Sequence, residues 1–189
     1  MVHMVQNKNN IEFEIVLVLI KNRAYLREIA RTINESHSTV LRKINELVRE
    51  NILDYKKEGR NKTFFIKDNL KAKNYTYSAE IYKLSKFLKK HPEMSIILED
   101  IKKNTPKGMI ILFGSYVKGN PKQNSDIDVY IETNDNKIKT KLQELNSKLN
   151  IKIGKFDTIS LLIKEIIKNH IIVRGVEEFY EKNKFFEQT

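Results

Sequence analysis

Two aspartates, Asp126 and Asp128, stand one residue apart at the head of an apolar run. In a β-strand the side chains of residues i and i+2 share a face, so both carboxylates point the same way while Ile127 and Val129 face the core. Two carboxylates this close repel each other unless a cation lies between or beside them. Mg²⁺ binds such oxygen ligands and takes its remaining ligands from water and substrate phosphates. The pair therefore indicates nucleotide chemistry.

The residues that precede this pair suit a phosphate. A second apolar run leads directly into Gly114 and Ser115. Gly114 has no Cβ, so a phosphate can approach the backbone closely, and Ser115 offers a hydroxyl and an N–H group at the mouth of a short predicted helix. Gly119 lets the chain turn back, and Ser125 is placed either to orient Asp126 or to contact a phosphate. The loop and the pair together predict a nucleotide site.

A third carboxylate is expected on a neighbouring strand, because in-line phosphoryl transfer commonly uses two metal ions about 4 Å apart and a base for the attacking hydroxyl. The candidate is Asp157, in a strand predicted over 151–158. The alternative is that Asp157 stands at the strand end and caps the following helix, and Gly154 can bulge the strand and shift its face. Glu132 shares the face of Asp128 but lies roughly 13 Å along the strand, too far to share the metals.

The first 70 residues predict three helices and a β-hairpin. Residues 11–21 form one compact apolar helix, and apolar residues spaced i, i+3, i+4, i+7 mark the face of a second. Ser36 is predicted to cap the third helix. Two apolar strands flank a basic, glycine-containing tip at 58–62. The inward stripe of the third helix is predicted to consist of Val40, Leu41, Ile44, Leu47 and Val48.

The remaining face of the third helix is polar. Short polar residues at a helix start with an arginine one turn later suit entry into the major groove of DNA, and basic side chains on the hairpin tip suit a phosphate or minor-groove contact. The alternative is a surface that binds only protein. The predicted DNA-binding residues are Ser38, Thr39, Arg42, Asn45, Arg60 and Lys62.

Over residues 11–70 the pattern resembles a winged helix-turn-helix, which implies binding to double-stranded DNA. Such proteins often dimerise to read two half-sites, so a homodimer is a further expectation. The matching residues are Leu26, Ile29, Ala30, Ser36, Val40, Ile44 and Leu47, together with the basic hairpin.

Residues 93–189 resemble the minimal nucleotidyltransferases of the DNA polymerase β superfamily. The matching residues are Gly114, Ser115, Gly119, Ser125, Asp126, Ile127, Asp128 and Asp157. The resemblance implies binding of an NTP, usually ATP, with two Mg²⁺ ions. It implies that Asp126 and Asp128 ligate the metals, and that Asp157 ligates one metal and helps to activate the acceptor hydroxyl. Many members carry Arg where this chain has Lys118, which can still contact a phosphate as a point charge but lacks the bidentate fork.

The expected fold class is α+β, with a winged helix-turn-helix over residues 1–73, a linker helix over 74–92 and a nucleotidyltransferase α/β domain with a mixed sheet over 93–189. The net charge of +11 favours a polyanionic partner. Six of the seven arginines lie in the first third of the chain. No apolar run approaches the ~20 residues of a membrane span and no signal peptide is evident, so we expect a soluble, cytoplasmic protein.

Three functions are consistent with these features. The first is an enzyme that moves NMP from an NTP to a hydroxyl; minimal relatives often act as antitoxins that modify a toxin of the HEPN family, so a toxin partner is expected. The second is a DNA-binding regulator whose nucleotidyltransferase fold is inactive or only senses NTP. The third is transfer to an RNA end, against which the modest basic excess of residues 105–189 (14 Lys and Arg, 11 Asp and Glu) argues.

Overall fold

The computed structural model describes residues 10–59, 61–122 and 124–188. The chain divides into two compact units, one that ends at Ala79 and one that runs from Glu80 to Gln188. Helix α4 (Leu70–Lys90), which is the helix expected as a linker, contributes residues to both units. Among the described residues, no helix combines the length and the apolar character that crossing a membrane requires.

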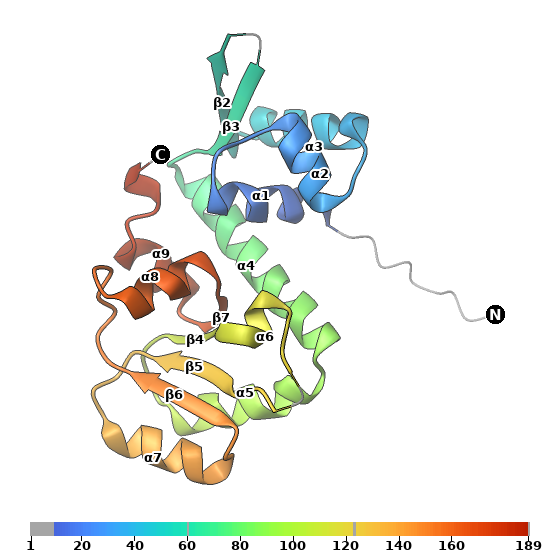
Figure 1. The fold of residues 1–189 in the computed structure, drawn as a ribbon. Helices are drawn as coiled ribbons and strands as arrows, with labels where there is room; N and C mark the ends of the chain where they lie inside the picture. The colour runs from blue at the N-terminus through green and yellow to red at the C-terminus, as the bar shows by residue number, and fades with distance from the viewer. Residues whose placement is uncertain (1–9, 60, 123, 189) are drawn as a thin grey trace, which may run out of the picture. The chain divides into compact units, whose positions relative to one another are not determined.

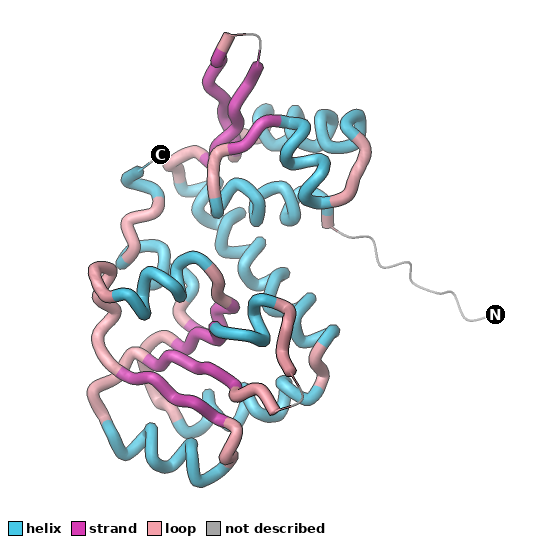
Figure 2. Tube along the Cα trace, viewed as in Figure 1, coloured by secondary structure: helices cyan, strands magenta, loops and turns pink. Residues whose placement is uncertain are grey.

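The first unit has the element order and strand pairing of a winged helix-turn-helix (Figures 1 and 2). Its three strands form an antiparallel sheet in the order β1-β3-β2, and β2 and β3 make the hairpin. The elements are α1 (Ile11–Lys21), β1 (Ala24–Tyr25), α2 (Leu26–Ile33), α3 (His37–Arg49), β2 (Leu53–Glu58) and β3 (Asn61–Ile66).

Helix α3 begins where the sequence predicts. The Ser36 Oγ accepts a hydrogen bond from the Thr39 backbone N–H at 3.2 Å, which satisfies one of the free donors of the first turn. Val40, Ile44 and Leu47 are buried as expected, but the prediction for Leu41 is wrong, because its side chain is 42% exposed. One residue advances the helix by about 100°, so the residue after Val40 falls outside the buried stripe.

The second unit contains a four-stranded mixed sheet in the order β6-β5-β4-β7. Strands β5 and β6 are parallel, and β4 is antiparallel to both β5 and β7. The fold class expected from the sequence, α+β with a mixed sheet, is confirmed. The elements after α4 are α5 (Glu93–Asn104), β4 (Ile110–Phe113), α6 (Gly114–Lys118), β5 (Ile127–Ile131), α7 (Asn136–Leu145), β6 (Leu149–Ile153), α8 (Leu161–Lys168), β7 (Ile171–Arg174), α9 (Val176–Lys182) and the 3-10 turn η1 (Phe186–Gln188).

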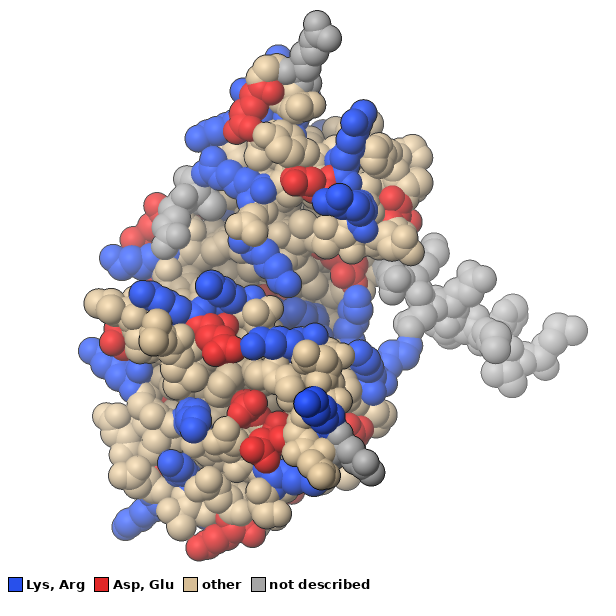
Figure 3. Space-filling view, viewed as in Figure 1, with Lys and Arg blue, Asp and Glu red and all other residues tan. Residues whose placement is uncertain are grey.

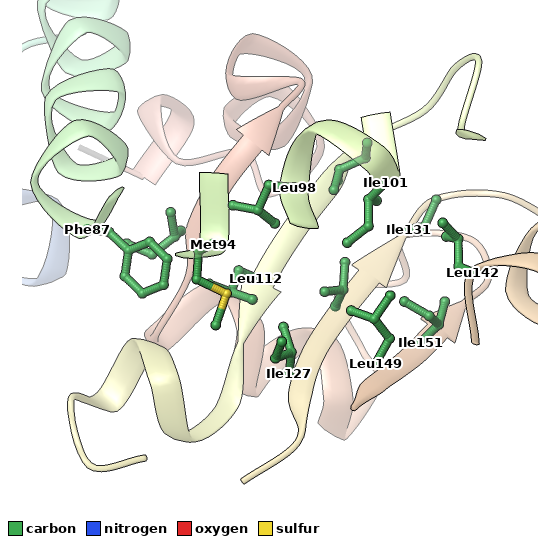
Figure 4. Close-up of a cluster of buried hydrophobic side chains, with 13 residues drawn as sticks. Phe87, Met94, Leu98, Ile101, Leu112, Ile127, Ile131, Leu142, Leu149 and Ile151 are labelled. Carbon is green, nitrogen blue, oxygen red and sulfur yellow. The ribbon is translucent and has the colours of Figure 1, made fainter. Parts of the chain in front are cut away.

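The two faces of this sheet differ in character. Ile127, Val129 and Ile131 of β5 point to one face, where they pack with buried residues of α5 and α7 (Figure 4). Asp128 and Tyr130 point to the other face, as the two-residue period of a strand requires. The alternation of β5 therefore separates a closed hydrophobic core from the face that carries the acidic side chains.

Strand β7 is an element that the sequence analysis missed. No strand was predicted at residues 171–174, but this segment forms an edge strand against β4. Arg174 at its end donates from Nε to the Gly108 carbonyl at 2.8 Å and from Nη1 to the Thr105 carbonyl at 2.6 Å. A four-residue strand has too short a pattern to be recognised from its own residues.

Candidate active site and nucleic-acid surface

The Asp128 carboxylate lies against the backbone of Gly114. In the antiparallel pairing of β4 and β5, Asp128 is opposite Phe113, so the chain that leaves β4 passes directly beside it. Gly114 has φ +74°, and a Cβ added there would lie 2.0 Å from the Asp128 Oδ2. Only glycine combines this backbone conformation with this approach. The Gly-Ser turn and the second aspartate are therefore built as one site.

Asn150 is the neighbour of Asp128 on the parallel strand. The register of β5 and β6 pairs Asp128 with Asn150, and the Asn150 Nδ2 donates a hydrogen bond to the Asp128 Oδ1 at 2.7 Å. Asn150 was not among the residues predicted from the sequence. A signal was present, because Leu149 and Ile151 are buried core residues and Asn150 lies between them, on the opposite face.

Asp126 lies immediately before β5 and is exposed. It forms no hydrogen bond or ion pair with any of the residues that the structure describes, so its carboxylate is available to a ligand. Ser125 closes the loop that leads to it: the Ser125 Oγ accepts a hydrogen bond from the Lys122 N–H at 2.7 Å, and the Ser125 N–H donates to the Lys122 carbonyl at 3.0 Å. Both bonds join Ser125 to Lys122 and fix the loop before Asp126.

Lys118 and Ser115 belong to the short helix α6, which starts at Gly114. Gly119 ends this helix with φ +76°, and thus makes the turn expected of it. The Lys118 Nζ lies 2.6 Å from the Glu165 Oε1, and the two side chains are 43% and 50% exposed. An exposed pair of this kind contributes about 0–1 kcal/mol to stability, so the ammonium group can exchange the carboxylate for a phosphate at little cost.

Asp157 is not brought to the aspartate pair. Strand β6 ends at Ile153 rather than continuing to residue 158, because Gly154 has φ +149° and the Tyr130 hydroxyl donates to the Gly154 carbonyl at 2.8 Å. The Asp157 side chain instead accepts a hydrogen bond from the Ile159 N–H at 3.0 Å. This is a correction to the expected trio: Asp157 lies in the loop before α8 and is not grouped with the pair. It does not cap α8 either, because the cap is Ser160, whose Oγ accepts from the Ile163 N–H at 3.2 Å.

The region around Asp157 belongs to the far end of the same sheet. Asp157 lines a shallow depression with Glu132, Lys155, Phe156, Thr158 and Lys182. The Phe156 N–H donates to the Glu132 Oε1 at 3.2 Å. Glu132 is four residues beyond Asp128, roughly 13 Å along an extended chain, so the depression and the aspartate pair are separate places on this face.

Most of the predicted DNA-binding residues of α3 lie on its open face. Ser38, Arg42 and Asn45 are exposed and Thr39 is partly buried. The Arg42 Nη1 donates to the Glu46 Oε1 at 3.0 Å within the same helix, and the Arg42 side chain is 62% exposed. An exposed pair one helical turn apart is weak, so the guanidinium can turn to a phosphate or a base.

Of the two basic residues predicted on the hairpin, the structure describes one. Lys62 is exposed, and its Nζ lies 3.9 Å from the centroid of the Tyr55 ring. This position over the ring is a cation–π contact. Arg60 lies outside the described residues.

Lys43 of α3, which was not predicted to have a role, faces inward and donates to the Glu12 Oε1 at 2.6 Å. This bond lowers the pKa of Glu12 and joins α3 to α1.

Figure 3 shows Lys and Arg side chains spread across both units on the face drawn, with Asp and Glu side chains between them. The net charge of +11 is therefore not gathered into one patch on that face. The case for a nucleic-acid surface depends on the open polar face of α3 and its hairpin rather than on the total charge.

Residues 94–184 match the family model described as a nucleotidyltransferase domain. The match covers α5 to α9, including the Gly-Ser turn and both aspartates. No curated protein matches the chain. Among solved structures, the adhesin competence repressor AdcR of Streptococcus pyogenes is similar at 20% identity, over 48% of this chain and 67% of that chain, with a TM-score of 0.39.

A nucleotidyltransferase domain generally uses an NTP and a divalent metal ion, and the donor set here fits one such ion. Asp128 lies on β5 and Asp126 immediately precedes it, and Mg²⁺ is commonly bound by one or two carboxylates together with substrate phosphates. Among the residues that the structure describes, no three His, Cys, Asp or Glu side chains are grouped to hold a metal.

Proposed function

We propose that the nucleotidyltransferase domain binds an NTP, with ATP as the first candidate, and transfers its NMP to a hydroxyl group. The observation that carries the proposal is the fit of the Asp128 carboxylate against the Gly114 backbone, where a Cβ would lie 2.0 Å from Oδ2. This close approach joins the turn that suits a phosphate to the carboxylates that suit its metal ion. The family match over residues 94–184 supports the same activity.

Each residue of the site has a defined part in this proposal. Asp126 and Asp128 hold one Mg²⁺ ion, which when bound neutralises phosphate charge and polarises the α-phosphate. The Ser115 hydroxyl and backbone N–H contact the phosphates at the start of α6. Lys118 leaves Glu165 and binds a phosphate oxygen, and its ammonium group stabilises the negative charge of the phosphate.

The reaction breaks one bond and forms one. The acceptor hydroxyl oxygen bonds to the α-phosphorus, the bond from that phosphorus to the bridging oxygen breaks, and pyrophosphate leaves with the bonding electron pair. The hydroxyl proton passes to solvent, because Asp157, the expected base, lies in the loop before α8 and is not grouped with the aspartate pair. The site thus acts by positioning and by charge stabilisation.

The N-terminal unit is proposed to bind double-stranded DNA through α3, with Ser38, Thr39, Arg42 and Asn45 toward the major groove and Lys62 toward a phosphate. Arg60 is proposed for the same role as Lys62. The support is the exposed polar face of α3 together with the capped start of that helix. Reading two half-sites requires a homodimer.

The acceptor is proposed to be a hydroxyl on a protein partner, a toxin of the HEPN type, which makes this chain the antitoxin of a pair that also regulates its own genes. The support is the combination of a DNA-binding fold with a nucleotidyltransferase domain in one chain.

The transfer is tested by incubating the protein with a candidate partner, Mg²⁺ and ATP labelled in the α-phosphate. We expect label to appear on the partner and to be lost with the double variant Asp126→Ala/Asp128→Ala, at least about a hundredfold, since one lost electrostatic contact to the reacting group already costs that much. Label that persists in the variant contradicts the proposal. So does a reaction in which no partner is labelled and no labelled AMP is released by transfer to water.

A second candidate function is a DNA-binding regulator that binds NTP without turnover. The observation that favours it is that the neighbour of Asp128 on the parallel strand is the amide of Asn150, whereas Asp157, the expected third carboxylate, lies in the loop before α8. This candidate predicts metal-dependent ATP binding that is lost in the double variant, with no release of pyrophosphate.

A further inference from the structure

On the parallel strand β6, the position paired with Asp128 carries an amide side chain, and the next position on the same face carries a cationic one. Asn150 is paired with Asp128, and Lys152 is paired with Tyr130 at the next position on the same face. A carboxylate on β6 that could reach a metal beside Asp128 would have to come from one of these two positions, because Leu149 and Ile151 point into the core.

The hydrogen bond of Asn150 shows how the amide is used. Its Nδ2 donates to the Asp128 Oδ1 at 2.7 Å, so one oxygen of Asp128 is held by a donor and the other faces Gly114. An amide group carries no net charge and is a weaker ligand for a hard cation than a carboxylate. Asn150 therefore orients Asp128 without adding the negative charge that a second dication needs.

We propose that Asn150 limits this site to a single protein-bound divalent ion, and that one changed atom in this side chain, amide nitrogen to carboxylate oxygen, converts it into a two-ion site. The inference rests on the proposed function, because it concerns the same aspartate pair. It assigns to Asn150 a positioning role toward Asp128 and a control over metal stoichiometry. The nucleotide of the unaltered protein is then bound through one ion shared between the pair and the phosphates.

The test counts ions directly. Wild type and Asn150→Asp are dialysed to equilibrium against Mn²⁺ with saturating α,β-methylene-ATP, in which the bond to be broken is resistant, and the Mn²⁺ retained per chain is measured by electron paramagnetic resonance. We expect one ion per chain for wild type and two for Asn150→Asp. Without nucleotide, the Mn²⁺ affinity of Asn150→Asp should exceed that of wild type by about tenfold or more, because a full charge replaces a neutral group near the ion.

Two control variants and a melting experiment distinguish the effect of the added charge from the loss of the Asn150 hydrogen bond and from a change in folding. Asn134→Asp makes the same chemical change at an exposed position beyond the end of β5 and should leave the count at one. Asn150→Ala removes the hydrogen bond without adding charge, and should keep the count at one with a Mn²⁺ affinity lowered several-fold. In Asn150→Asp, carboxylate repulsion without metal should lower the melting temperature, and Mn²⁺ should restore it.

The outcomes distinguish this inference from the function on which it rests. Two ions per chain in wild type, or one in a folded Asn150→Asp, overturns the role of Asn150 and leaves the proposed nucleotide site standing. No ion and no nucleotide bound by either protein overturns both. Where Asn150→Asp does not fold, two ions per chain in wild type, or an unchanged Mn²⁺ affinity in Asn150→Ala, still overturns the role of Asn150.

Discussion

At the scale of single residues, the site depends on one contact between a carboxylate and a glycine. Gly114 and Gly119 flank the same short helix and both have positive φ, +74° and +76°. Their surroundings differ, because a Cβ at Gly114 would meet Asp128 whereas one at Gly119 would meet nothing within 4 Å. Substitutions at the two glycines therefore distinguish the effect of backbone strain from the effect of contact with Asp128.

Gly114→Ala is expected to displace Asp128 and to weaken Mg²⁺-dependent ATP binding by about tenfold or more, because the added methyl group occupies the place of the Oδ2. Gly119→Ala is the matched control. Both should lose about 1 kcal/mol of stability from the left-handed backbone, but only Gly114→Ala should lose binding. Isothermal titration with ATP and Mg²⁺ measures the difference, and equal binding by the two variants would contradict the assignment of Gly114.

At the scale of elements, the ends of strands and helices decide which side chains meet. Strand β6 ends at Ile153, and the Tyr130 hydroxyl bonded to the Gly154 carbonyl marks the point where the chain leaves the sheet. Asp157 is separated from the aspartate pair for this reason. Helix α3, in contrast, begins at the cap that the sequence predicted, so its polar face is presented as expected.

Arg42→Ala is expected to lower the affinity for double-stranded DNA by about 1–3 kcal/mol if it contacts a base, and to reduce the salt dependence by about one unit of slope if it contacts a phosphate. Fluorescence anisotropy across a series of salt concentrations distinguishes the two. Lys141→Ala, which removes an exposed cation from α7 in the other unit, is the control. Equal affinity of the Arg42 and Lys141 variants for DNA at low salt would contradict the proposal that α3 binds DNA.

At the scale of the whole molecule, a buried charge network joins distant segments of the second unit. Glu80 on α4 is fully buried; its Oε1 accepts from the Tyr180 hydroxyl at 2.9 Å and lies 3.3 Å from the His170 Nε2. The Lys83 Nζ lies 2.5 Å from its Oε2. Burial alone would raise the pKa of Glu80, but the hydrogen bond with His170 and the charge of Lys83 outweigh it and lower the pKa to about 2. The sequence analysis did not detect this network, because its members lie far apart in the chain.

The lowered pKa has a consequence for stability. A carboxyl whose pKa is lower in the folded state stabilises the protein above its unfolded value, and this contribution is lost as pH falls from about 4.5 toward about 2. We expect Glu80→Gln to destabilise the second unit by about 3 kcal/mol at pH 7, with a difference from wild type that shrinks below pH 4.5. Urea unfolding between pH 7 and pH 3 measures it, with the exposed Glu144→Gln as control. A difference that stays constant with pH would contradict the role of Glu80.

The sequence by itself determined the parts of this protein that depend on neighbours along the chain. The two-residue period placed Asp128 on the face opposite the core residues of β5, the glycines marked the turns around α6, and Ser36 marked the start of α3. The three helices and the hairpin of the first unit were recognised from the same local periods, whereas β7 was too short.

Only the tertiary structure decided what lies opposite Asp128. Periodicity assigns a side chain to a face of its strand, but it does not state which residue of another strand is its partner. That partner depends on the register between β5 and β6, which are joined through α7, and on where β6 ends. The register is set by how the buried side chains of both strands pack against α5 and α7, a non-local condition. It places Asn150 beside Asp128 and leaves Asp157 in the loop before α8.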